Sequence, residues 1–127
     1  MNDVIFIIYV ADQEKSRIFY EQVLGDPPVL DVSGMTEFQI NENSKFGIMP
    51  EEGIVRLLGD NCAQTPWPKE FPHCELYLMV EDVEASFQKL VDAGGRTISQ
   101  PSLRNWGDLV AYGADPDGHI IAFAKKA

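Results

Sequence analysis

The sequence predicts an α+β protein built from two tandem modules, each with the element order βαβββ. First, an apolar strand ends in Val-x-Asp directly before a helical segment in both halves, at Val10–Asp12 and at Val80–Asp82. Second, the halves match at an offset of 70 residues, which places Gly95 on Gly25. Third, three short strand-like segments follow each helical segment. The second half of the chain therefore repeats the first.

The first module is assigned to residues 1–50. Val4–Val10 is an Ile-rich strand, and Asp12 is a good N-cap for a helix over Gln13–Leu24, because its carboxylate can accept from free backbone N–H groups. Gly25 supplies the stop of this helix. The segments predicted as strands after it are Val29–Val32, Met35–Ile40 and Lys45–Met49.

Residues 51–72 form a predicted connector, because this stretch is rich in proline. The pattern allows a helical turn at Gly53–Leu58. Trp67 lies between Pro66 and Pro68, where it would cap a binding cavity or form a dimer contact. A connector of this length is uncommon in a small protein and indicates a lid or a crossover between modules.

The second module is assigned to residues 73–127 and begins with a strand within His73–Asp82. A helix follows, with Asp82 as its predicted N-cap and Gly95 as its predicted stop. Three more strands are predicted, at Arg96–Ser99, Asp108–Gly113 and His119–Ala124, the last two joined by the tight hairpin Asp115–Gly118. The chain is thus expected to be a single domain made of module 1–50, connector 51–72 and module 73–127.

The composition favours a cytoplasmic protein that binds neither nucleic acid nor membrane. The net charge is −10, and the ten Lys and Arg residues are scattered, whereas phosphate binding needs clustered basic residues. No apolar run approaches the roughly 20 residues of a membrane span, and no basic region precedes Val4–Val10 as in a secretory signal. Cys62 and Cys74 are expected to be reduced thiols.

The strand within His73–Asp82 has two unlike faces, since successive side chains alternate. One face is apolar and suits packing under a helix; it carries Leu76, Leu78 and Val80. The other face places a carboxylate among an imidazole, a phenol and a thioether; it carries His73, Glu75, Tyr77 and Met79. Glu75 is therefore either solvated on an open sheet or the polar point of a binding pocket.

The tandem βαβββ units, with Val-x-Asp before each helix, resemble the vicinal oxygen chelate superfamily. This superfamily contains glyoxalase I, extradiol dioxygenases, and fosfomycin- and bleomycin-resistance proteins. The closing segment, Asp115-Pro116-Asp117-Gly118 followed by the apolar strand Ile120–Phe123, is similar to the last hairpin of the family. The resemblance covers nearly the whole chain. It implies that the strands curl into a cup-shaped, mixed and mostly antiparallel sheet, with the helices outside and a ligand inside.

The resemblance also implies where a metal would be held in metal-dependent relatives. A His or Gln is expected seven residues before the Asp that starts each helix, and these positions are Ile5 and Glu75 here. A Glu is expected four residues after the Gly of the closing hairpin, where this chain has Ala122. The remaining position falls within Lys45–Met49, which offers no good ligand. The usual metal site is therefore not expected.

Several roles remain open for Glu75. In an apolar cup, desolvation would raise the pKa of its carboxyl group, so that it could act as a general base or anchor a ligand amine or hydroxyl. Alternatively, it is half-exposed or bonded to a neighbour. His73 and Glu75 could also hold a divalent metal such as Zn²⁺, Ni²⁺, Fe²⁺ or Mn²⁺, although His73 is expected to be exposed.

Further ligand contacts are predicted from the strand faces and from one loop. The faces directed into the cup would offer Tyr9, Tyr77, Met79 and Ala122. In the loop, Trp106 could wall the cup while Arg104 or Asp108 fixes a polar group of the ligand. The alternative is that Trp106 packs between modules and Arg104 pairs with Asp108.

The leading expectation is a protein that binds a small organic molecule in an apolar cup, with Glu75 as the polar determinant and no metal cofactor. This is similar to the bleomycin-resistance branch, and the acidic charge would favour a cationic ligand. The alternative is a glyoxalase-like lyase or isomerase that uses Glu75 as a base or in a non-standard metal site. The resemblance further implies a homodimer.

Overall fold

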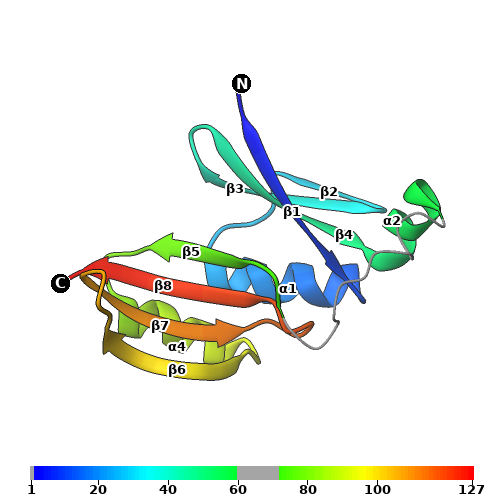
Figure 1. Cartoon of the computed structure of the whole chain (residues 1–127). Helices are drawn as coiled ribbons and strands as arrows, with labels where there is room; N and C mark the ends of the chain where they lie inside the picture. The colour runs from blue at the N-terminus through cyan, green and yellow to red at the C-terminus, as the bar shows by residue number, and fades with distance from the viewer. Residues whose placement is uncertain (1, 60–71) are drawn as a thin grey trace. The chain divides into compact units, whose positions relative to one another are not determined.

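A computed structural model describes residues 2–59 and 72–127 of the chain (Figure 1). The chain divides into two compact units, Met1–Trp67 and Pro68–Ala127, and each is described by itself. The predictions made for Cys62 and Trp67 lie outside the described residues.

The first unit is a mixed four-stranded sheet with a helix packed on one face. Its elements, in chain order, are β1 (Val4–Val10), α1 (Gln13–Leu24), β2 (Leu30–Val32), β3 (Met35–Asn41), β4 (Ser44–Pro50) and α2 (Glu51–Leu58). The strand order is β1-β4-β3-β2. β1 runs parallel to β4, and the other neighbouring strands are antiparallel.

The second unit repeats this arrangement. Its elements are β5 (Glu75–Met79), α4 (Val83–Asp92), β6 (Arg96–Leu103), β7 (Asp108–Ala114) and β8 (Ile120–Lys126). The strand order is β5-β8-β7-β6, with β5 parallel to β8 and the other pairs antiparallel. The predicted α+β class and the repeated βαβββ order are thus confirmed, as two open, mostly antiparallel sheets.

Both main helices begin at the predicted caps. The side chain of Asp12 accepts the backbone N–H of Lys15 at 3.1 Å, and that of Asp82 accepts the N–H of Ala85 at 3.0 Å. An N-cap of this kind contributes about 1 kcal/mol to the stability of a helix. The offset of 70 residues therefore reflects the same helix N-cap at the same position in both units.

The two helices end differently. Gly25 closes α1 with a φ of 86°, in the left-handed region, as predicted. In the second unit the left-handed residue is Gly94, with a φ of 96°, so the prediction that Gly95 stops the helix is wrong by one residue. Gly95 is required for close packing instead, because a Cβ there would lie 2.5 Å from Cδ2 of Leu90.

Leu90 of α4 packs tightly against two glycines of the second unit, Gly95 and Gly113. Its side chain is fully buried, and a Cβ on Gly113 would lie 2.6 Å from its Cδ2 atom. Gly113 pairs with Ile121, which pairs in turn with Leu76. These residues therefore mark the face of the second sheet that the helix covers.

The core of the first unit lies between α1 and the matching face of its sheet. The Tyr20 ring of α1 packs 4.7 Å from the Phe46 ring of β4, measured between centroids. Buried apolar side chains fill this layer, namely Ile8, Val10, Phe19, Tyr20, Val23, Phe38, Phe46 and Ile48. Their burial supplies the main driving force for folding of this unit.

We call the face of each sheet that lies opposite α1 or α4 its open face. Because side chains alternate, the strand register decides which residues lie there. The open face of the first sheet pairs Ile5, Ile7 and Tyr9 with Lys45, Gly47 and Met49. The open face of the second sheet pairs Glu75, Tyr77 and Met79 with Ile120, Ala122 and Ala124, as the alternation predicted.

Some strand bounds differ from the prediction. β5 begins at Glu75, so His73 lies before the strand. β6 continues to Leu103 rather than ending at Ser99, with register shifts on either side of Ser99. These irregularities accommodate Pro101, which has no N–H for the ladder and is tolerated at a sheet edge.

The first part of the predicted connector is a helix. α2 spans Glu51–Leu58 and contains the predicted turn at Gly53–Leu58. It packs against β4 and β1 of the first unit, with Ile54 buried.

Among the described residues, no helix is long and apolar enough to cross a membrane. Cys74 is an exposed free thiol.

Gly113→Ala is expected to destabilise the second unit, because the new methyl group would overlap Leu90. Overpacking of this kind costs about 1–3 kcal/mol of unfolding free energy. Urea denaturation would measure the loss, and the double variant Gly113→Ala with Leu90→Ala should show less than the sum of the single losses. Gly53→Ala is the control, because its Cβ would meet Pro50 Cγ at an ordinary 3.5 Å.

Candidate functional site

The open face of the second sheet brings together most of the predicted site residues. Its floor is formed by Val110, Ala122 and Ala124, which are fully buried, and Tyr77 and Tyr112 pack against this floor. Ala122 therefore lies beneath the two aromatic rings. The small alanine side chains leave space above the sheet for both rings.

A chain of hydrogen bonds crosses this face. The Tyr77 hydroxyl donates to Oδ2 of Asp108 at 2.6 Å, and it accepts the indole N–H of Trp106 at 3.0 Å. Trp106 stands in the β6–β7 turn beside Gly107, which takes a left-handed φ of 96°. The indole is 56% exposed, so it presents an accessible aromatic surface held in place through its N–H group.

This environment changes the acidity of Tyr77. Partial burial raises the pKa of the phenol, and its hydrogen bond to the Asp108 carboxylate raises the pKa further. The N–H group of Trp106 acts in the opposite direction, because it stabilises the phenolate. Tyr77 therefore remains a protonated donor to Asp108 at neutral pH.

Arg104 lies on the same open face. Its guanidinium carbon is 5.3 Å from the centroid of the Tyr112 ring, and its Nη2 donates to Oγ of Ser99 at 2.8 Å. The anticipated side-chain pair between Arg104 and Asp108 is not among the ion pairs of the described residues; these two residues are joined by a backbone bond of 2.9 Å. Sequence reasoning missed Ser99, because the bond depends on the irregular path of β6.

Glu75 opens β5 and is exposed, next to Ile120 on the neighbouring strand. Met79, at the other end of the strand, is 54% exposed. His73 is exposed two residues before Glu75. In the second unit the Glu75 carboxylate is thus exposed to solvent, at the margin of the open face that carries Tyr77 and Tyr112.

The open face of the first sheet is mostly apolar. Tyr9 is 44% exposed there, beside Ile5 and Ile7. One ion pair joins Nζ of Lys45 to Oε1 of Glu37 at 3.5 Å, and the Glu37 side chain is only 14% exposed. The sequence analysis did not single out Glu37, although alternation along β3 places it on the same face as Met35.

One group of three candidate metal ligands occurs among the described residues, and it lies away from the open faces. Asp115, Asp117 and His119 form it within the β7–β8 hairpin. Buried Asp115 accepts the backbone N–H groups of Asp117 and His119, each at 2.9 Å, and lies 2.8 Å from Nδ1 of His119. These bonds hold the turn closed.

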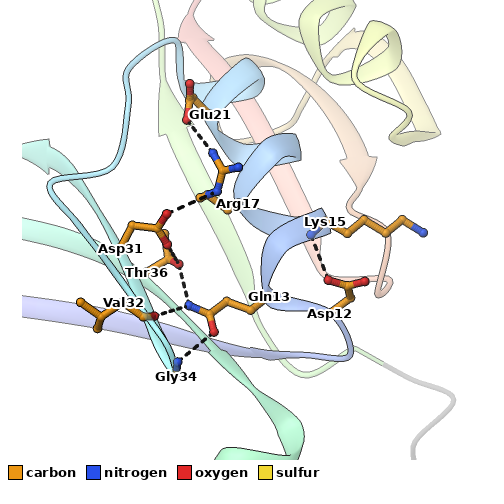
Figure 2. Close-up of polar contacts among 9 residues, drawn as sticks. All are labelled: Asp12, Gln13, Lys15, Arg17, Glu21, Asp31, Val32, Gly34 and Thr36. Atoms are coloured by element: carbon orange, nitrogen blue, oxygen red, sulfur yellow. Dashed lines mark hydrogen bonds and ion pairs between the residues drawn. The ribbon is translucent and has the colours of Figure 1, made fainter.

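A polar cleft of about 660 Å³ lies in the first unit, between the start of α1, the β2–β3 turn and α2. Figure 2 shows the wall formed by α1: Gln13 Nε2 donates to Val32 O at 2.8 Å, and Gly34 N donates to Gln13 Oε1 at 3.0 Å. Arg17 contacts Asp31 at 3.5 Å and Glu21 at 3.2 Å. No pattern in the sequence indicates this cleft, since it depends on tertiary contacts.

Comparison with known proteins gives a consistent family assignment. Residues 4–126 match the model of the glyoxalase-like domain family. A 74-residue stretch is 30% identical to uncharacterized proteins of Mycobacterium bovis and Mycobacterium tuberculosis, covering 58% of this chain and 48% and 43% of those proteins. The matched stretch thus spans less than half of the length of these relatives.

Two solved structures are similar over nearly the whole chain. A glyoxalase-related enzyme from Fulvimarina pelagi has a TM-score of 0.82 and 24% identity, covering 97% of this chain and 86% of that one. A glyoxalase/bleomycin resistance protein/dioxygenase family enzyme from Burkholderia phytofirmans has a TM-score of 0.82 and 16% identity, covering 97% of both chains. At these identities the likeness establishes the fold.

The raised pKa of Tyr77 predicts an alkaline loss of stability. The folded state holds the phenolic proton more tightly than the unfolded chain, so this contribution is complete below about pH 10 and is lost as the pH rises through the raised pKa. Tyr77→Phe should flatten the fall in unfolding free energy that begins above about pH 10. Denaturant titrations at several pH values would measure it, with exposed Tyr9→Phe as control. Parallel curves for wild type and Tyr77→Phe would contradict the assignment.

Proposed function

The chain belongs to the glyoxalase-like domain family, and from this we propose that it binds a small organic molecule on its open sheet faces, with Glu75 as a polar determinant and without the usual metal site of the family. The observation that carries this proposal is the aromatic open face of the second sheet. It combines a flat, accessible indole and two tyrosine rings with the carboxylates of Glu75 and Asp108.

The residues at the expected metal positions support binding without a metal. Ile7 pairs with Gly47 in the first unit as Tyr77 pairs with Ala122 in the second, so the register places Gly47 at the position that sequence left open. The four positions are then Ile5, Gly47, Glu75 and Ala122. Of these, only Glu75 has a side-chain donor atom for a cation. The residues present do not fit the metal site of the family.

The electrostatics favour a cationic or amine-bearing ligand. The protein carries a net charge of −10, which steers cations toward it. On the open face, Trp106 offers a π surface on which a cationic group or an aromatic ring can lie. A protein of this kind would act by sequestering its ligand, in the manner of bleomycin-resistance proteins.

The second candidate function is a lyase or isomerase of the glyoxalase kind. Glu75 favours this alternative in one respect, because its carboxylate lies on the same face as the Tyr77 hydroxyl and could accept a proton from a bound substrate. A non-standard metal site at His73 and Glu75 would be a variant of this function.

We also propose that the protein is a homodimer. β1 is an edge strand with apolar side chains that remain exposed, including Ile5 at 43%, Phe6 at 41% and Ile7 at 36%. Apolar edge strands in monomeric proteins are normally covered or charged.

Sedimentation equilibrium should therefore give twice the chain mass, and Ile7→Lys should shift the protein toward monomers.

Glu75→Gln separates the two candidate functions. For binding, affinity for a cationic aromatic probe such as benzyltrimethylammonium should fall by about two- to fivefold, as expected for an exposed charge. For catalysis, turnover of a hemithioacetal should fall by about 10²–10⁴-fold, because a general base would be lost. Calorimetry and a glyoxalase assay measure the two. Unchanged affinity and unchanged turnover would remove Glu75 from both functions.

Chelator-treated protein should keep the same melting temperature when Ni²⁺, Zn²⁺, Mn²⁺ or Fe²⁺ is added, because a ligand stabilises only a native state that binds it. Differential scanning fluorimetry and elemental analysis would measure this. A stoichiometric metal whose stabilising effect disappears in Glu75→Ala would contradict the metal-free proposal. His119→Ala controls for binding at the hairpin.

A further inference from the structure

We infer that the ligand of the open face carries an anionic group, such as a carboxylate, which binds to Arg104, as well as the cationic or polar group proposed for Glu75. This inference rests on the proposed function and names the ligand class more closely: a small aromatic molecule with an acidic and a basic substituent. The feature that carries it is the charge of Arg104, which has no acidic partner among the described residues.

Arg104 is held in a fixed position on the open face. The Tyr112 ring lies under its guanidinium at 5.3 Å, and Ser99 Oγ takes one of its N–H groups at 2.8 Å. Both partners face the open side, because Tyr112 pairs with Ala122 and with Ser99 across the sheet. The planar guanidinium is therefore pre-organised before any ligand arrives.

The positive charge of Arg104 has no acidic partner among the described residues. Their ion pairs involve Arg17, Lys45 and His119 instead. Asp108 is close in sequence, but it accepts the Tyr77 hydroxyl at 2.6 Å. In a chain with 20 acidic residues, a half-buried arginine without a carboxylate partner is unusual.

The hydrogen bonding of Arg104 is also incomplete. Its Nε atom is buried and has no hydrogen-bond acceptor among the described residues. It is the one buried side-chain nitrogen or oxygen atom of those residues that lacks a hydrogen-bond partner. An unsatisfied donor on a charged group is costly, so this guanidinium is under-compensated in the protein itself. An anion beside the guanidinium would supply the missing countercharge and accept from its Nη atoms.

The surroundings define the rest of the ligand. The aromatic groups of Tyr77 and Trp106 line the same face beside the Arg104–Tyr112 pair, so a flat ring attached to the anionic group can lie on them. Glu75, at the start of β5, remains available for an amine or hydroxyl. An aromatic amino acid or amino-aryl acid has these three features.

Three probes test the inference: 4-(aminomethyl)benzoate, its amide 4-(aminomethyl)benzamide, and 4-methylbenzoate. Calorimetry should show that the first probe binds about tenfold more tightly than the amide, as expected for a charge-assisted contact. Arg104→Gln should abolish this preference. Arg104→Lys should keep part of it, because a lysine retains the charge but not the planar donor fork.

Two further variants serve as controls. Arg96→Gln removes the same charge from exposed Arg96 in the same sheet and should leave the carboxylate preference unchanged. Glu75→Gln should weaken both amine-bearing probes while keeping the preference for the acid over the amide. Circular dichroism of each variant would confirm that it folds.

The outcomes distinguish this inference from the proposed function. If the amide binds, and Trp106→Ala weakens it, but the carboxylate adds no affinity, the proposed function stands and the inference fails. If carboxylates bind through Arg104 while Glu75→Gln changes nothing, the inference stands and the role proposed for Glu75 fails. A carboxylate preference that survives Arg104→Gln, or no binding of either carboxylate, also overturns the inference.

Discussion

The register of the parallel pair β5–β8 determines the chemistry of the second unit. It aligns Tyr77 with Ala122, so that one face of the pair carries aromatic and polar groups. The same register aligns Leu76 with Ile121 on the other face, where Leu90 of α4 packs. A shift of one residue would exchange the two faces, bringing Glu75 under the helix and exposing the core. Burial of the sheet face under α4 therefore fixes the register, and the register fixes which residues lie on the open face.

The two units share this plan but differ in what they display. The first presents a largely apolar open face with one ion pair, between Lys45 and Glu37. The second presents a hydrogen-bonded chain that runs from Trp106 through Tyr77 to Asp108, and a separate guanidinium at Arg104. The duplicated backbone thus carries two chemically unlike surfaces, and the aromatic hydrogen-bonded chain belongs to the second.

Sequence alone predicted the features that depend on local chemistry or on period-two alternation. Asp12 and Asp82 were recognisable as caps because capping involves residues only three positions apart. The face that holds Glu75 and Tyr77 followed from alternation. The bond from Arg104 to Ser99 did not follow, because bulges in β6 decide it. Sequence left the exposure of Glu75 open between two alternatives, because burial depends on tertiary contacts, and the structure leaves Glu75 exposed. Gly94 displaced Gly95 as the left-handed residue because packing against Leu90 already required Gly95.

The placement of Ile5, Gly47, Glu75 and Ala122 on open faces has an evolutionary consequence. Residues under α1 and α4 carry the folding free energy, so changes there are costly, as the space beneath Leu90 illustrates. Substitutions on an open face alter the surface chemistry at a smaller cost in stability. A lineage built on this scaffold can thus gain or lose donor atoms one position at a time, moving between sequestration and catalysis while the fold is retained.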